Sequence, residues 1–339
     1  MTRLNDIRIV PYAAAANESA LSLEAQCVQG ESLILRFRRP TFHARSEVYD
    51  KYRILCAKVK NKVIGIIAGA EKFVSLHGEI IRTIYIYDLR VHPDYRKQGT
   101  ARRLNNALME DVGNADCVYS LIAGQNKSAL IVAQRVLDAQ VVVPLTYAVI
   151  PVYKKLRGEA PYQPSSVSEV HETYLKLLPD TQFVPALQEN RLLGYISSVT
   201  LLNMESCGFS LWTNENLLAE QVVDIPFHFR LMRPLIAPLQ PFLRLPHIPK
   251  PGEIMQSWFL FDFCTTDKKN TSNLLTIANN IAFDDNRTFL YILLGSNDST
   301  LRFIKNSGFR VFTIPYFFIA RGRITPAEND RIYIDIRDL

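Results

Sequence analysis

The segment HPDYRKQGTARRL (92–104) places three arginines and a lysine around a single glycine, Gly99. It lies between the apolar run TIYIYDLRV (83–91), which predicts a strand, and a pattern over 101–111 that predicts a helix. A glycine before a helix permits a left-handed turn, and the unpaired N–H groups of the first helical turn attract anions. The charged side chains that would assist are Arg96, Lys97, Arg102 and Arg103. The segment favours a phosphate-binding loop, although a solvated helix start would show the same charges.

The elements that must position this loop read as an α/β unit. A strand is expected at 7–13, a helix near 19–27 and a second short helical region before Tyr52. Lys60-Asn61 and His77-Gly78 then separate three strand patterns, which predicts an antiparallel meander with short turns. Helix and strand follow twice more. The three strand patterns of the meander lie at 53–59, 62–76 and 79–91.

The chain also contains an internal repeat. The segment 117–150 aligns without a gap with 288–320, pairing Gly124 with Gly295 and Asn126 with Asn297. Upstream, IYIYDLRV (84–91) aligns with WFLFDFCT (258–265), which places Asp88 opposite Asp262. A repeat of this length predicts two related α/β domains in tandem. We expect them at residues 1–156 and 170–339, joined by a Pro- and Ser-rich linker within 154–171.

Three motifs occur in a fixed order in the first half. DLRVHP (88–93) fits Asp-Leu-x-Val-x-Pro, RKQGTA (96–101) fits Arg/Gln-x-x-Gly-x-Gly/Ala, and NKSA (126–129) fits Asn-x-x-Ala. Together they resemble the acyl-CoA site of the GNAT family of N-acetyltransferases, over about residues 7–150. The second half looks like a degenerate copy, because its loop TTDKKNTSNLL (265–275) has no glycine. The tandem layout is also similar to that of plant hookless-type acetyltransferase-like proteins.

The resemblance implies an α/β (α+β) fold of two tandem GNAT-like domains, each a mixed, mainly antiparallel sheet flanked by helices. It implies acetyl-CoA as the acyl donor, with pantetheine entering between two splayed strands like an added strand. Backbone amides near Gly99 would bind the pyrophosphate. The expected cofactor-binding residues are Leu89, Arg90, Val91, Arg96, Lys97, Gln98, Gly99, Thr100, Ala101, Arg102 and Asn126.

The implied reaction is direct attack of an amine on the thioester in a ternary complex, with the Leu89 N–H stabilising the oxyanion. Tyr87 stands where the family often has Glu or His, and Tyr85 shares its face, so these two are the candidate catalytic residues. A phenol, with a pKa of about 10, is a poor base but can order a water. Both tyrosines would equally suit a packed core. Ala133 replaces the family's tyrosine acid, so a catalytically weak or inactive CoA-binding regulator or scaffold is the alternative function.

The composition limits the possible ligands, partners and cellular location of the protein. The net charge of +6 favours an anionic ligand, but no nucleic-acid-binding motif accompanies it, and we expect no nucleic-acid partner. The chain has no apolar run of transmembrane length and no secretory signal, so we expect no membrane association and a cytoplasmic location. Five scattered cysteines suggest reduced thiols, and the histidines form no metal motif. The segment 231–251 reads as a proline-broken surface stretch, while the acceptor amine and the oligomeric state stay open.

Overall fold

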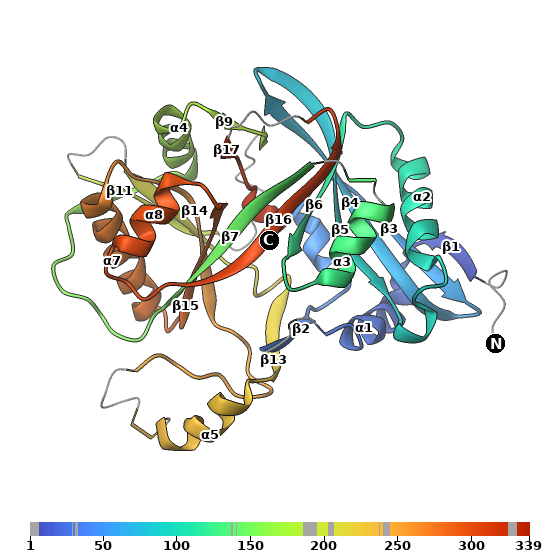
Figure 1. Ribbon diagram of the computed structural model, residues 1–339, viewed down its shortest axis with the longest axis horizontal. Coiled ribbons are helices and arrows are strands. Elements are labelled where there is room, and N and C mark those ends of the chain that lie inside the picture. Colours follow the sequence, from blue (N-terminus) through green and yellow to red (C-terminus); the bar gives the residue numbers. More distant parts are fainter. Residues whose placement is uncertain are drawn as a thin grey trace.

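The computed structural model describes residues 7–28, 30, 33–136, 138–139, 141–185, 195–202, 207–236, 238–239, 245–324 and 331–339. One 13-stranded sheet runs through the molecule in the order β1-β3-β4-β5-β6-β16-β7-β15-β14-β12-β11-β8, with β10 added beside β4. Helices flank it in both halves (Figure 1). Within this sheet the pairs β5–β6 and β14–β15 are parallel and the other described pairs are antiparallel. The expected mixed, mainly antiparallel α/β fold is confirmed.

The first half follows the predicted order of elements closely. Lys60 and His77 have φ angles of 53° and 49°, and Gly78 has 80°, so the two turns of the meander are tight and left-handed where the sequence places them. The elements are β1 (Ile7–Pro11), α1 (Asn17–Ala25), β2 (Ile34–Arg38), β3 (Lys51–Val59), β4 (Lys62–Leu76), β5 (Glu79–Val91), α2 (Thr100–Val112), β6 (Cys117–Ala123), α3 (Lys127–Val136) and β7 (Val141–Pro151).

The second half departs from expectation in two places. The expected linker contains β8, which pairs with β11, and the start of α4. The segment 231–251 is exposed as expected, for example at Leu231 and Leu235, but it begins inside a helix, α5, which contains Pro234 two residues before its end. The elements are β8 (Tyr162–Ser165), α4 (Val167–Leu177), β9 (Thr181–Gln182), β10 (Val184–Pro185), β11 (Tyr195–Leu201), β12 (Gly208–Trp212), β13 (Ala219–Asp224), α5 (Phe227–Ile236), β14 (Ser257–Cys264), α7 (Lys268–Asp284), β15 (Phe289–Gly295), α8 (Ser299–Asn306), β16 (Phe312–Gly322) and β17 (Arg331–Ile332).

The internal repeat is confirmed in the backbone. Asp88 of β5 and Asp262 of β14 both have left-handed backbones, with φ of 53° and 48°. Each lies at a register shift against the neighbouring antiparallel strand, β4 in one half and β12 in the other. Both are therefore β-bulges, which bend the strand that carries them. The parallel pairs β5–β6 and β14–β15 occupy equivalent positions in the two halves.

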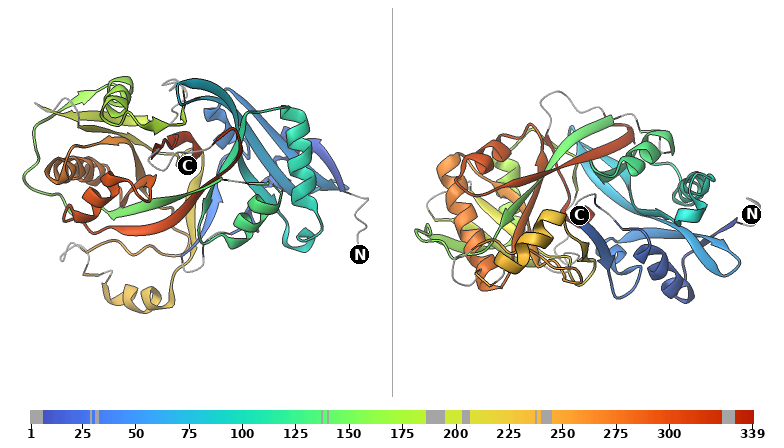
Figure 2. Two further views of the ribbon diagram at one scale, coloured as in Figure 1. Left: turned by 45° about the horizontal axis from the view of Figure 1, so that its top comes forward. Right: turned by 60° about the horizontal axis from the view of Figure 1, so that its bottom comes forward.

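The last strands of the two halves are exchanged. β16, from the second half, pairs with both β6 and β7 of the first half. β7 in turn pairs with β16 on one side and with β15 on the other. Figure 2 shows these two long strands crossing the centre of the molecule between the halves. The sheet is therefore continuous, and a central hydrophobic cluster contains side chains from both halves, such as Tyr85, Tyr119, Phe259 and Phe318.

A close approach at this exchange gives a testable prediction. A Cβ added to Gly124, just after β6, would lie 2.9 Å from Cγ of Pro315 in β16, and the Gly124 N–H donates to Pro315 O at 2.7 Å. Gly124→Val should therefore push β16 away and lower the free energy of unfolding by about 1–3 kcal/mol. The repeat supplies a control, because a Cβ on Gly295 meets nothing within 4 Å. Gly295→Val should change stability in urea denaturation by no more than about 0.5 kcal/mol. Equal effects would contradict the prediction.

Candidate functional site

Two neighbouring strands of the first half separate to form an opening in the sheet. β5 and β6 are paired from Thr83 to Tyr85 on one strand and from Cys117 to Tyr119 on the other. Beyond these pairs β5 follows β4, while β6 follows β16. The His92 N–H donates to Ile64 O of β4 at 2.8 Å. Because backbone groups alternate along a strand, those of Val91 and Leu89 face the opening.

The bulge at Asp88 lies where the strands part, and its carboxylate is held by three arginines, of which Arg39 and Arg90 are buried and Arg45 is partly buried. Arg39 Nη1 lies 2.8 Å, Arg90 Nη2 3.2 Å and Arg45 Nη1 3.7 Å from the carboxylate oxygens. Burial alone would raise the pKa of Asp88, but the three guanidinium groups outweigh burial and hold this pKa below its ordinary value. The sequence analysis did not find Arg39 and Arg45.

A second carboxylate completes this cluster. Glu24, on α1, is ion-paired to Arg39 and also lies 3.0 Å from Arg90 Nη2. The sequence analysis did not find Glu24 either, because Glu24 and Arg39 match no motif. The arginine-rich stretch at 36–45 is the feature that could have indicated a buried charge cluster. The cluster fixes the shape of β5 at the opening. It also commits the guanidinium of Arg90, whose backbone is paired with Ile66 of β4 and so faces away from the opening.

The turn before α2 is open. Gly99 is exposed, has φ of 77° and forms the N-cap of the helix, and nothing lies within 4 Å of a Cβ built there. The first N–H to bond along the helix is that of Arg103, to Gly99 O at 3.0 Å. Within the described part of the chain, no group accepts a hydrogen bond from the amides of Gly99, Thr100, Ala101 and Arg102. These amides form the kind of anion site expected at a helix N-terminus.

The side chains around this turn are positioned unequally. Lys97 and Arg102 are exposed, and Lys97 has a left-handed backbone with φ of 59°. Arg96 Nε donates to Val91 O at 3.1 Å, and Gln98 Nε2 donates to Asp94 O at 2.8 Å. Thr100 is buried, with its hydroxyl 3.3 Å from Tyr95 O. Lys97 and Arg102 are thus the two best placed to meet an anion.

Asn126 lies across the opening, at the start of α3. Its side chain is exposed, and its Oδ1 accepts from the Ala129 N–H at 3.0 Å. This is a capping interaction that fixes the helix start beside the end of β6. The amide nitrogen of the side chain stays available to a ligand in the opening.

Tyr85 and Tyr87 lie on the other face of β5 from α2, in the central cluster. The Tyr85 hydroxyl donates to Asp338 O at 2.6 Å, and the Tyr87 hydroxyl lies 2.7 Å from Ser46 Oγ. Burial raises the pKa of both phenols. Because a raised pKa keeps both phenols protonated near neutral pH, neither is suited to act as a base there, and their catalytic role stays a prediction.

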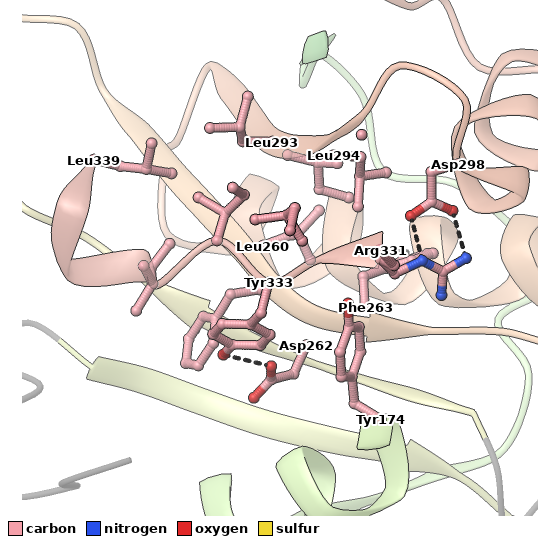
Figure 3. Close-up of a pocket in the computed structure, with 16 residues that line it drawn as sticks. Tyr174, Leu260, Asp262, Phe263, Leu293, Leu294, Asp298, Arg331, Tyr333 and Leu339 are labelled. Atoms are coloured by element: carbon pink, nitrogen blue, oxygen red, sulfur yellow. Dashed lines mark hydrogen bonds and ion pairs between the residues drawn. The ribbon is translucent and has the colours of Figure 1, made fainter. Parts of the chain in front are cut away.

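The equivalent opening of the second half is filled by the chain itself. Residues 331–339 lie between β14 and β15 (Figure 3), where Tyr333 OH donates to Asp262 Oδ1 at 2.8 Å. Arg331 Nε lies 3.0 Å from Asp298 Oδ2, at the N-cap of α8. The remaining cavity measures about 30 Å³, room for a water or two. This opening has no space for a coenzyme arm.

Two further observations concern membrane-spanning helices and metal sites. Among the residues that the structure describes, no helix is both long enough and apolar enough to cross a membrane. Within the same residues, no group of three or more His, Cys, Asp and Glu side chains could hold a metal ion.

The splayed strands, the bulge and the open turn define a GNAT-type acyltransferase fold. Residues 19–138 match the family model of the Acetyltransferase (GNAT) family. Two crystal structures of N-myristoyltransferase from Saccharomyces cerevisiae with bound myristoyl-CoA match with TM-scores of 0.63 and 0.65 at 11% and 12% identity. These matches cover 96% and 99% of this chain, and 85% and 83% of theirs.

A putative acetyltransferase from Pyrococcus horikoshii is also similar, with a TM-score of 0.54 and 11% identity over 98% of this chain and 96% of that chain. A search of curated protein sequences gave no match. At such low identities the structural similarity establishes the shared fold and leaves the activity of this chain to its own residues.

Proposed function

We propose that this chain is an N-acyltransferase that transfers an acetyl group from acetyl-CoA to an amine by direct attack in a ternary complex. The observation that carries the proposal is the open turn at Gly99, whose unpaired amides lie at the exit of a strand that separates from its parallel neighbour. A pyrophosphate fits the turn and an extended pantetheine arm fits the opening.

The residues of the opening would divide the work. The backbones of Leu89 and Val91 would pair with the arm, and the Leu89 N–H would polarise the thioester carbonyl. The loop from Arg96 to Arg102 would bind the phosphates, and Asn126 would fix the arm from the other wall. Holding both reactants side by side would supply much of the rate enhancement.

The same proposal assigns unequal roles to the two domains expected at 1–156 and 170–339. The first would hold the coenzyme. The second would be a degenerate copy that shapes the acceptor side, because its own opening is occupied by residues 331–339. We also propose that the chain shares the tandem layout of the plant hookless-type acetyltransferase-like proteins that its sequence resembles.

One observation favours the second candidate, a CoA-binding regulator without turnover. The hydroxyls of Tyr85 and Tyr87 are both engaged and have raised pKa values, so the expected proton acceptors are absent from these two positions.

Two measurements on the full chain separate these functions. Calorimetry should show binding of CoA, and a thiol-release assay with acetyl-CoA should show turnover with at least one member of a panel of small amines and peptides. Binding without thiol release across the panel would favour the regulator. Absence of CoA binding would overturn both.

A further inference from the structure

Glu220, on β13, is a carboxylate without a counter-ion. Among the described residues, none forms a hydrogen bond or an ion pair with its side chain, and its residue surface is only partly exposed. Burial alone raises the pKa of Glu220 to about 7. A carboxylate taken from water without compensation is costly, so an unpaired one calls for an explanation.

Three tyrosines from three different strands lie close enough to this carboxylate for its charge to act on them. Val222, two residues further along β13, packs in one cluster with Phe289, whose ring centroid lies 6.2 Å from that of Tyr291. The ring centroid of Tyr147 on β7 lies 5.0 Å from that of Tyr291 on β15 and 5.3 Å from that of Tyr316 on β16. Burial is the main reason that the pKa values of all three phenols are raised, and the nearby charge of Glu220 raises them further. Tyr147 and Tyr316 are each partly exposed at the surface.

This cluster adjoins the opening between β5 and β6 from both sides. Glu220 is paired across β2–β13 with Phe37, whose ring centroid lies 5.4 Å from the guanidinium carbon of Arg90 on β5. On the other wall, Tyr316 is paired with Ala123 at the end of β6. The carboxylate and the rings therefore lie beside the place where the thioester would end.

We infer that Glu220, Tyr147 and Tyr316 form the binding site for the acceptor, recognised as a positively charged amine. A carboxylate supplies the opposite charge, and tyrosine faces and hydroxyls supply cation–π and hydrogen-bond contacts to an ammonium group. The inference rests on the proposed function for its placement beside the donor. It explains why an acidic side chain lies unpaired among aromatic rings.

The test uses two probes of similar shape, benzylammonium and the uncharged benzyl alcohol, with the full chain. Calorimetry should show benzylammonium binding at least ten-fold more tightly than the alcohol. Glu220→Gln keeps the shape and removes the charge, so it should abolish this preference. Asp224→Asn is the matched control, since Asp224 lies on the same strand but is ion-paired to Arg230.

Each outcome has a distinct meaning. A charge preference lost in Glu220→Gln and kept in Asp224→Asn supports the site. No preference in the unaltered chain, or equal loss in both variants, overturns it. CoA affinity measured in the same samples should not change in either variant. Failure of CoA to bind would overturn the proposed function, while the amine preference would still decide the amine site.

A stability measurement gives a readout that needs no ligand. Because the folded pKa of Glu220 is above its unfolded value, the stability it contributes is present at low pH and is lost as pH rises through about 7. The groups that face it are Tyr147, Tyr291, Tyr316 and, across the ribbon, Phe37, and all four are uncharged at these pH values. The unaltered chain should therefore lose stability between pH 5 and pH 8 in urea denaturation. Glu220→Gln should flatten this loss, and an unchanged profile would count against an unpaired carboxylate.

Discussion

Replacing Gly99 with glutamate is expected to abolish coenzyme A binding. Gly99 has φ of 77°, a conformation that other L-residues adopt at a cost, and it lies at the N-terminus of α2 with open space around it. A carboxylate there would occupy the anion site and repel a pyrophosphate. Calorimetry should show the dissociation constant for CoA rising by at least a hundred-fold.

The other end of the same helix supplies the control. Gly113 forms the C-cap of α2, has φ of 69°, and also has nothing within 4 Å of a built Cβ. Gly113→Glu makes the same charge change far from the turn at Gly99, at a backbone conformation (φ 69°, ψ −167°) that disfavours a side chain even more strongly than that of Gly99, so it also controls for backbone strain. CoA affinity should be preserved in this variant. Binding that survives Gly99→Glu, or that is lost equally in both variants, would overturn the coenzyme site.

The second large effect is expected at Asp88, where Asp88→Asn should lower the free energy of unfolding by about 3–5 kcal/mol. Asparagine keeps the shape and tolerates the left-handed backbone at this bulge. It removes the charge that compensates Arg39, Arg45 and Arg90, leaving Glu24 as the remaining carboxylate of the cluster. Urea denaturation at pH 7 measures the difference.

The repeat again provides a matched variant. Asp262 lies at the equivalent bulge but contacts His171 Nδ1 at 3.0 Å and Tyr333 OH at 2.8 Å, and no arginine among the described residues is ion-paired to it. Asp262→Asn should therefore cost only about 1–2 kcal/mol. Equal costs at the two positions would contradict the charge argument.

The effect of pH on Asp88 has a definite sign. Its folded pKa is depressed, so its stabilising contribution is present above the unfolded pKa of about 3.9 and is lost as pH falls through the folded value. The difference in free energy of unfolding between the unaltered chain and Asp88→Asn should persist at pH 5 and decrease only below about pH 4. If this difference vanished by pH 5, the pKa of Asp88 would not be depressed.

Local signals in the sequence were sufficient for much of the fold. The meander was predicted with nearly the observed bounds because Lys60-Asn61 and His77-Gly78 interrupt three strongly apolar strands. The turn at Gly99 was predicted because the glycine and its basic neighbours lie between a strand and a helix, within three motifs in a fixed order. The repeat was visible because Asp88 and Asp262 form the same left-handed bulge in each half, and because Gly124 and Gly295 follow the aligned strands at matching positions.

What sequence reasoning missed depends on contacts between distant segments. No local pattern indicates that β16 pairs with β6 and β7, since strand partners are chosen by the assembled core. Glu220 is one of two acids on a short strand, and only the fold brings its charge near Tyr147 and Tyr316. Residues 331–339 match no motif, yet they fill the second opening.

The exchange of the last strands also constrains how this chain can evolve after its duplication. Deleting either half would remove a central strand from the other half. β16 of the second half lies between β6 and β7 of the first half, and β7 pairs with β15 of the second half. Mutations can erode the ligand loop of the second copy, as the glycine-free stretch at 265–275 illustrates, while its framework must persist. The second half is thus retained because the first half cannot fold without it, although its surface can still change.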